Sequence, residues 1–457
     1  MHRLSARGKI RDILLDNDNV WNVLDRGIEL GVARPFLKDV VKKMLNCGKE
    51  AGGFAVYKCE DCGEEVRVPF SCKTRFCNKC GVALTDEWVS RTEARMIDIE
   101  HRHVIFTMPR ELWDIFAVER SLLKILQPRA AEVLKEWGNR LAITQGIITV
   151  LHTFGADLKW NPHVHSVVTE GGLTQDGKWR GWYLGRGYKQ PYISFKFLQE
   201  RWRSKILLSL RHKLPLIWRK NEAMREYIHN EVNRIRRKNG KRSVRKVPHC
   251  AEIQELINYL FSRSWCVNAE SRVSTGINTI RYIGRYSKRP VIAESRIISY
   301  NGEYVEFLCE REDGVFGEGG LGSDTIKMGA KEFIISLLRH VPDKGFRMIN
   351  QFGLYAASIW HRVRGVLISI GMFIRKSVKV LNWSERIKKS TGRDPLKCIF
   401  CGGKMLLYTI HYLREGKLRV KRYLRFGGYI TRKANRVWIA GVNKFTKVEE
   451  TGQLSFI

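Results

Sequence analysis

Apolar residues recur at two different spacings along the 457-residue chain, and together they predict a mixed α+β protein. Short apolar runs predict strands at 103–108, 147–154 and 163–169. Apolar positions three and four residues apart predict helices within 1–45, 111–137, 195–263, 277–286 and 331–340. A hairpin signal at Asn301-Gly302 predicts two more strands within 291–308. This order of elements favours an antiparallel sheet flanked by helices.

The charge of the chain favours a polyanionic partner. Lys and Arg total 81 against 46 Asp and Glu, which gives a formal net charge of +35. Residues 201–250 carry a net charge of +13 and residues 361–457 a net charge of +17, so two blocks hold most of the excess. We interpret these blocks as phosphate-contacting surfaces, with nucleic acid as the partner.

No apolar run reaches the roughly 18 residues that a membrane-spanning helix needs. The first residues also lack the apolar core of a signal peptide, so we expect the chain to stay inside the cell and to have no membrane partner. Eleven cysteines in a reducing compartment are expected to be thiols or metal ligands rather than disulfides.

Two Cys-x-x-Cys knuckles predict a structural zinc site whose ligands are Cys59, Cys62, Cys77 and Cys80. Each knuckle lets two thiolates converge on one ion, and two knuckles complete the tetrahedral shell that Zn²⁺ prefers. Cys47 and Cys72 remain as candidates to replace a ligand or to form a second site. A third knuckle, Cys398-x-x-Cys401, is only half of such a motif, because no partner knuckle follows it.

His163 and His165 flank Val164 on a predicted strand and are candidate ligands of a second kind of metal site. Residues two apart on a strand point to the same face, so both imidazoles can reach one ion. His101 and His103 form a similar pair, but a charged residue separates them, and we interpret this pair as accidental.

Tyr282 and Tyr286 are four residues apart in a predicted helix, so both phenols share one helix face. Two tyrosines at this spacing more often pack in a core than act as nucleophiles. The surrounding cations favour a role at phosphate instead, and they are Arg281, Arg285, Lys288 and Arg289.

Zinc knuckles followed by an His-x-His strand and then a Tyr-x-x-x-Tyr helix resemble the two-tyrosine HUH transposases of rolling-circle insertion sequences, the IS91-like group. The resemblance covers nearly the whole chain. It is carried by residues 71–80, 103–109, 151–155, 161–165, 282–289 and 339–346, which read SCKTRFCNKC, HVIFTMP, LHTFG, NPHVH, YIGRYSKR and RHVPDKGF. One departure is Ala55, which stands where the family often has a His before the first knuckle.

The resemblance implies an HUH nuclease domain at 96–360, with a central antiparallel sheet and a helical insertion at about 195–263. A helical and zinc-binding DNA-binding domain would precede it at 1–95, and a basic C-terminal region would follow at 361–457. The implied partners are single-stranded DNA and the ends of the element. The implied location is the cytoplasm of a prokaryotic cell, in association with the nucleoid.

The resemblance also implies roles for residues. His163 and His165 would hold Mg²⁺ or Mn²⁺, with Asp157 as the candidate third ligand and His152 as the alternative. Tyr282 or Tyr286 would attack the scissile phosphate and form a 5′-phosphotyrosine. The residues expected to contact DNA are Arg285, Lys288 and Arg289 beside the tyrosines, and Arg236 and Arg237 in the basic cluster.

Three other functions fit parts of the sequence. A rolling-circle replication initiator or relaxase would use the same chemistry. A tyrosine recombinase would use His361, Arg364 and Tyr408, would need no metal, and would leave a 3′-phosphotyrosine. A zinc-dependent DNA-binding relative without activity would explain the charge and the cysteines but not the histidine and tyrosine pairs.

Overall fold

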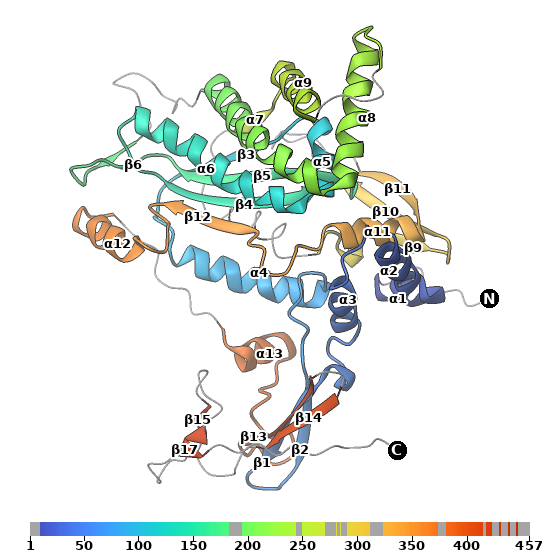
Figure 1. Cartoon of the computed structure of the whole chain (residues 1–457). Coiled ribbons are helices and arrows are strands. Elements are labelled where there is room, and N and C mark those ends of the chain that lie inside the picture. The colour runs from blue at the N-terminus through green and yellow to red at the C-terminus, as the bar shows by residue number, and fades with distance from the viewer. Residues whose placement is uncertain are drawn as a thin grey trace. The chain divides into compact units, whose positions relative to one another are not determined.

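The computed structural model describes residues 10–181, 194–243, 249–269, 280, 284, 290–310, 323–372, 381–414, 417–422, 429–430, 437–438 and 445–446. The chain forms two compact units (Figure 1). The sheet unit comprises Met1–Asn19 and Trp88–Val378, and the cysteine unit comprises Val20–Glu87 and Lys379–Ile457. This division differs from the predicted one, because the chain returns after residue 378 to the unit that holds the first zinc knuckles.

A five-stranded antiparallel sheet forms the centre of the sheet unit, with strand order β12-β4-β5-β3-β8. The strands are β3 (His101–Phe106), β4 (Gly146–Phe154), β5 (Trp160–Thr169), β8 (Val267–Ala269) and β12 (Ile349–Gly353). All nine residues of β4 are buried, because helices cover both faces of the sheet. The predicted α+β class with an antiparallel sheet is confirmed.

One face of this sheet carries the largest hydrophobic core of the described residues. Side chains such as Leu151 and Val164 point toward it from the strands, and Trp202 is fully buried in it. Its helices are α5 (Trp113–Val118), α6 (Leu123–Arg140), α7 (Phe195–Lys220), α8 (Glu222–Lys238) and α9 (His249–Ser262), which lie above the sheet in Figure 1. The indole nitrogen of Trp202 donates to the carbonyl of Thr107 at 2.6 Å, so this side chain anchors the helices to the sheet.

The opposite face carries a second core, which includes Ile148, Val150 and Val167 from the strands. Val89 of α4 (Asn78–Glu93) and three residues of α12 (Trp360–Ser369) pack there. Residues of β4 therefore alternate between the two cores, as the period of two along a strand requires. The remaining elements of the unit are α1 (Ile10–Leu15), β6 (Gly172–Leu173), β7 (Trp179–Arg180), β9 (Ile297–Tyr300), β10 (Tyr304–Glu310), β11 (Ser323–Gly329) and α11 (Ala330–Arg339).

The cysteine unit is built on a four-stranded antiparallel sheet with strand order β14-β13-β1-β2. These strands are β1 (Phe54–Cys59), β2 (Glu65–Pro69), β13 (Met405–Arg414) and β14 (Lys417–Arg422). The central pair consists of β1 and β13, which lie on either side of the segment Trp88–Val378 in the sequence. In this pair, Phe54 lies opposite His411 and Cys59 lies opposite Met405. Other elements are α2 (Asn19–Glu29), α3 (Leu37–Leu45), α13 (Trp383–Thr391), β15 (Tyr429–Ile430), β16 (Val437–Trp438) and β17 (Phe445–Thr446). Among the described residues, no helix has both the length and the apolar character needed to span a bilayer.

Candidate functional site

The hairpin of β4 and β5 brings three imidazoles together on one face of the central sheet. His152 of β4 lies directly opposite His163 of β5, and His165 lies opposite Val150. The ligand atoms of His152, His163 and His165 all lie within 4.8 Å of one another. These residues share a face with Val150 and Val167, so the imidazoles project on the side of the second core.

A bulge shapes this hairpin where the histidines lie. The register shifts between the His152–His163 pair and the Phe154–Trp160 pair, which leaves an extra residue in β5. Pro162, which has no amide hydrogen to donate, stands within that stretch of β5. A bulge bends a strand and re-aims its side chains, and this one begins directly after the regular register that pairs His152 with His163.

Hydrogen bonds fix the orientation of two of the rings. Nδ1 of His163 lies 2.7 Å from the carbonyl oxygen of Asn161, which leaves Nε2 to face the other imidazoles. Nδ1 of His165 lies 2.8 Å from Nε2 of His103 on the neighbouring strand. His103 is itself buried, and its ring stacks on that of His165 with centroids 5.0 Å apart. The pair His101-x-His103, which we interpreted as accidental, therefore supplies a contact to the site.

The environment keeps His165 neutral. Burial lowers the pKa of His165 well below its usual value, and the imidazoles of His152, His163 and His103 lower it further. His152 and His165 are 2% and 4% exposed, whereas His163 is half-buried. The group therefore opens to solvent at His163, and neutral imidazole is the form that binds a metal ion.

Asp157, the first candidate for a third ligand, is not part of this group. Its carboxylate accepts from the amide of Lys159 at 3.1 Å and pairs with the Lys159 ammonium at 2.8 Å. Asp157 thus closes the turn between β4 and β5. The hairpin register places the alternative candidate, His152, opposite His163, so His152 rather than Asp157 lies within reach of the pair.

Tyr282, Tyr286, Arg285, Lys288 and Arg289 lie outside the described residues. Two neighbours of the tyrosines are described, and both are helical: Ile280 and Gly284. Ile280 is fully buried in the second core, together with Ile148 and Val150. A Cβ at Gly284 would lie 2.8 Å from Cγ2 of Val89, so this position lies close against α4.

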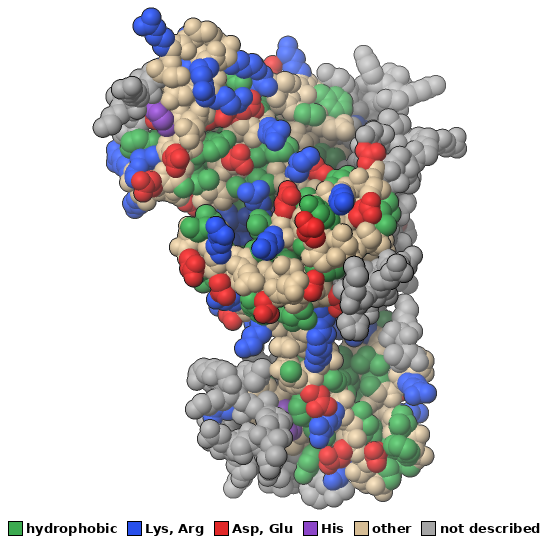
Figure 2. All heavy atoms as spheres, turned by 90° about the vertical axis from the view of Figure 1, so that its right-hand side faces the viewer, with side chains coloured by type: hydrophobic (Ala, Val, Ile, Leu, Met, Phe, Trp, Pro, Cys, Tyr) green, Lys and Arg blue, Asp and Glu red, His purple; other side chains and the backbone are tan. Residues whose placement is uncertain are grey.

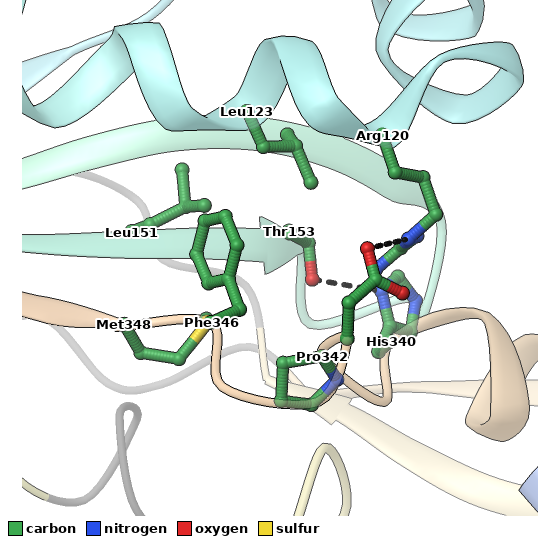
Figure 3. Close-up of a pocket in the computed structure, with 9 residues that line it drawn as sticks. Arg120, Leu123, Leu151, Thr153, His340, Pro342, Phe346 and Met348 are labelled. Carbon is green, nitrogen blue, oxygen red and sulfur yellow. Dashed lines mark hydrogen bonds and ion pairs between the residues drawn. The ribbon is translucent and has the colours of Figure 1, made fainter. Parts of the chain in front are cut away.

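The segment 339–346 lines a shallow pocket against the other face of β4 (Figure 3). Nδ1 of His340 lies 3.1 Å from the hydroxyl of Thr153, and its Nε2 lies 3.0 Å from the carbonyl oxygen of Leu158. Arg120 pairs with Asp343 at 3.7 Å and covers the ring of Trp160. Because Thr153 follows His152 on the strand, the pocket lies on the face away from the three imidazoles. These contacts secure both ends of the β4–β5 turn.

The predicted DNA-binding cluster at the end of α8 contains two different kinds of cation. Arg236 makes a double ion pair with Glu255 of α9, with contacts of 2.5–3.0 Å, and this raises its pKa. Arg237 is exposed, as are Lys238, Lys241 and Arg242. Figure 2 shows Lys and Arg side chains on the upper surface, where α8 ends in Figure 1. The exposed residues can meet phosphate, whereas Arg236 joins two helices.

Eight of the eleven cysteines form two groups of four, in place of the single predicted site. One group is Cys47, Cys72, Cys77 and Cys80, and the other is Cys59, Cys62, Cys398 and Cys401. The structure divides the predicted set between these groups, with the first knuckle, at the end of β1, in one and the second, at the beginning of α4, in the other. Each knuckle therefore joins a different pair of partners.

In the first group, Sγ of Cys80 lies 3.5 Å from Sγ of Cys47 and 3.6 Å from Sγ of Cys72. The contact with Cys77 lowers the pKa of Cys72 to about 5, which favours the thiolate form of Cys72. Cys77 and Cys80 stand at the beginning of α4, where the helix dipole also favours negative charge. Thiolates are the form in which cysteine binds a metal ion.

Two protein-family models match consecutive parts of the chain. Residues 22–108 match the model of a transposase zinc-binding domain, and residues 146–362 match the model described as putative transposase. The first region contains six of the eight grouped cysteines, and the second contains the three imidazoles and both tyrosines.

Two relatives match most of the chain. The transposase for insertion sequence element IS801 of Pseudomonas savastanoi pv. phaseolicola is 28% identical over 400 residues, which are 84% of this chain and 85% of the relative. The putative transposase y4qJ of Sinorhizobium fredii (strain NBRC 101917 / NGR234) is 25% identical over 378 residues, or 80% of this chain and 87% of the relative. No solved structure matches the chain.

Proposed function

Because the chain belongs to the IS91-like insertion-sequence transposases and carries their N-terminal zinc-binding module, we propose that it cuts and rejoins single-stranded DNA through a 5′-phosphotyrosine. The observation that carries the proposal is the group of His152, His163 and His165 on one face of the sheet. A central strand with His-x-His in an antiparallel sheet is what an HUH nuclease requires. β5 is the middle strand of the five.

The donor atoms fit a divalent cation. Three imidazoles whose ligand atoms lie within 4.8 Å of one another offer three nitrogen ligands, and His163 is the most exposed of the three. Mg²⁺ prefers oxygen ligands, whereas imidazole suits transition metals, so among the two expected ions the donor set favours Mn²⁺. When bound, the ion supplies charge that polarises the scissile phosphate.

His103 acts in this proposal as a positioning residue. If Nδ1 of His165 donates to Nε2 of His103, then Nε2 of His165 is left with its lone pair for the ion. Partners of this kind fix the tautomer and the orientation of a ligating imidazole. His103 and His165 are both almost fully buried, so water does not compete for this contact.

The nucleophile in this proposal is the phenol oxygen of Tyr282 or Tyr286. The phenolate attacks phosphorus, the bond to the 3′ oxygen breaks, and the products are a 5′-phosphotyrosine and a free 3′-OH. Attack by a 3′-OH on the phosphotyrosine reverses the step and rejoins the strand. Burial of Ile280 on the imidazole-bearing face supports this assignment, since Ile280 precedes Tyr282 by two residues.

The module's zinc is structural, and we assign one ion to Cys47, Cys72, Cys77 and Cys80. Sulfur atoms on a tetrahedral Zn²⁺ ion, each about 2.3 Å away, are about 3.8 Å apart. The Sγ–Sγ distances of 3.5 and 3.6 Å in this group approach that spacing.

The test is a covalent trapping assay with single-stranded oligonucleotides from the element's ends and Mn²⁺, read on denaturing gels. A 3′ label should migrate with the protein, whereas a 5′ label should leave on a shorter free fragment. A protein-linked 5′ label would show the opposite linkage and support the tyrosine recombinase alternative. An absence of any adduct would support the inactive relative.

Matched variants locate the nucleophile. The double variant Tyr282→Phe/Tyr286→Phe should form no adduct, and each single variant should retain at least one cleavage step. Tyr408→Phe, which changes an exposed tyrosine of the cysteine unit, should behave as the wild type. An adduct that persists in the double variant would contradict the assignment.

A further inference from the structure

Two knuckles from opposite ends of the chain have the same backbone design. The amide of Cys59 donates to the carbonyl of Glu64 at 2.8 Å, and the amide of Gly63 donates to the carbonyl of Cys59 at 3.2 Å. In the other knuckle, the amide of Cys398 donates to the carbonyl of Gly403 at 2.8 Å, and the amide of Gly402 donates to the carbonyl of Cys398 at 3.0 Å. Gly63 and Gly402 have φ angles of 79° and 75°, a left-handed conformation that glycine adopts without strain.

The sulfur atoms of these knuckles converge. Sγ of Cys401 lies 3.5 Å from Sγ of Cys59 and 3.4 Å from Sγ of Cys62, and the Cys62–Cys398 distance is 3.6 Å. A disulfide would need about 2.05 Å, whereas four sulfurs around one tetrahedral zinc ion lie about 3.8 Å apart.

Among the described residues, the apolar cluster around this group is small. The buried cluster there consists of Cys59, Cys398 and Met405, with Tyr57 and Val66 partly buried against it. The ring of Tyr57 stacks on Trp383, with centroids 5.6 Å apart. So small an apolar cluster is typical of modules that depend on a bound metal for their fold.

We infer that Cys59, Cys62, Cys398 and Cys401 bind a second structural zinc ion, which fastens the C-terminal part of the chain to the N-terminal zinc-binding module. Four sulfur ligands on one ion fit Zn²⁺. Two of the ligands lie far beyond residue 108, where the match to the zinc-binding domain ends. The ion closes a loop that contains the whole remainder of the sheet unit from Trp88 to Val378.

Thiol reactivity in the intact, zinc-loaded chain tests this inference. Cys62 and Cys401 are exposed, and so are Cys250 and Cys266, which lie outside both groups. In reducing buffer, N-ethylmaleimide followed by mass spectrometry should label Cys62 and Cys401 at least tenfold more slowly than Cys250 and Cys266. A strong zinc chelator should remove the difference. Equal labelling of all four before chelation would overturn the inference.

Zinc content gives an independent measurement. The wild-type chain should hold two zinc ions, Cys401→Ser should hold one, and Cys266→Ser should hold two. Cys401→His should restore the second ion, because an imidazole nitrogen can replace a thiolate on zinc. Two ions in Cys401→Ser, or only one in the wild type, would contradict the site. If Cys401→Ser does not fold, the labelling of the native chain decides the question.

Discussion

The group of His152, His163 and His165 and the group of Cys59, Cys62, Cys398 and Cys401 could each hold a metal ion, but the protein assembles them in opposite ways. His152, His163 and His165 come from one hairpin, and its register alone brings them together. Cys59 and Cys62 meet Cys398 and Cys401 only because β1 pairs with β13 across most of the sequence. The first group is thus a product of local structure and the second of long-range closure.

The two groups also differ in what surrounds them. The imidazoles stand on a sheet with a large core on each face, so we expect the scaffold to fold without an ion. The buried cluster at the four cysteines has three members, and two of them are the cysteines Cys59 and Cys398 themselves. We therefore expect a metal to serve chemistry in the first group and folding in the second. The predictions that follow test this division.

The largest expected effect is that of His165→Ala on cleavage. Loss of one of three ligands should remove the ion's stabilisation of the phosphate, worth several kcal/mol, which is on the order of a thousandfold in rate. Adduct formation should fall by that amount, while zinc content and the thermal unfolding of both units stay close to wild type. His212→Ala, which changes an exposed histidine of α7, is the control.

Stepwise removal of metal should distinguish the role of the ion at the imidazoles from that of zinc at the cysteines, in one sample. Mild chelation should stop adduct formation without a change in circular dichroism, and Mn²⁺ should restore activity more fully than Mg²⁺. Harsher chelation that strips zinc should unfold the cysteine unit. Unfolding of the sheet unit upon mild chelation would contradict the division between a chemical and a structural metal.

His103→Ala should have an intermediate effect. Loss of a residue that orients a metal-ligating imidazole typically costs 10–100-fold in metal affinity or activity. We expect the Mn²⁺ concentration for half-maximal adduct formation to rise by about that factor, with much of the activity returning at saturating Mn²⁺. A fall in activity that no concentration of Mn²⁺ repairs would mean that His103 has a different role.

The sequence predicts local structure better than it predicts assembly. His163 and His165 were identified because a period of two on one strand places them on one face. The choice between Asp157 and His152 depended on the hairpin register and its bulge, which no spacing reveals. The edge strand β12 was not predicted, since each of its residues is half-buried and its sequence shows no alternation.

For a related reason, the sequence did not predict how the cysteines are grouped in the structure. Knuckle spacing showed that Cys59, Cys62, Cys77 and Cys80 could bind zinc, but spacing cannot show which knuckles meet. The missing information was the pairing of β1 with β13, which depends on contacts between residues more than 330 positions apart. Cys398-x-x-Cys401 was the available signal, as a knuckle without a partner nearby.

The smallest expected effect concerns DNA binding by the basic cluster at the end of α8. The test compares the exposed Arg237 with its ion-paired neighbour Arg236. Replacement of the exposed Arg237, Lys238 and Lys241 by Gln should weaken the binding of single-stranded DNA and make it less dependent on salt. Each lost phosphate contact lowers the slope of log K against log salt by about 0.7, so three contacts should lower it by about 2.

Arg236→Gln is the matched control, because it also removes one positive charge from α8. Since Arg236 is held by Glu255, its loss should leave the salt slope unchanged and lower the stability of the α8–α9 contact by about 1 kcal/mol. Fluorescence anisotropy at several salt concentrations, together with thermal unfolding, measures both quantities. If Arg236→Gln by itself lowers the slope by about 0.7, the value for one lost phosphate contact, then the ion pair opens on DNA and Arg236 also contacts phosphate.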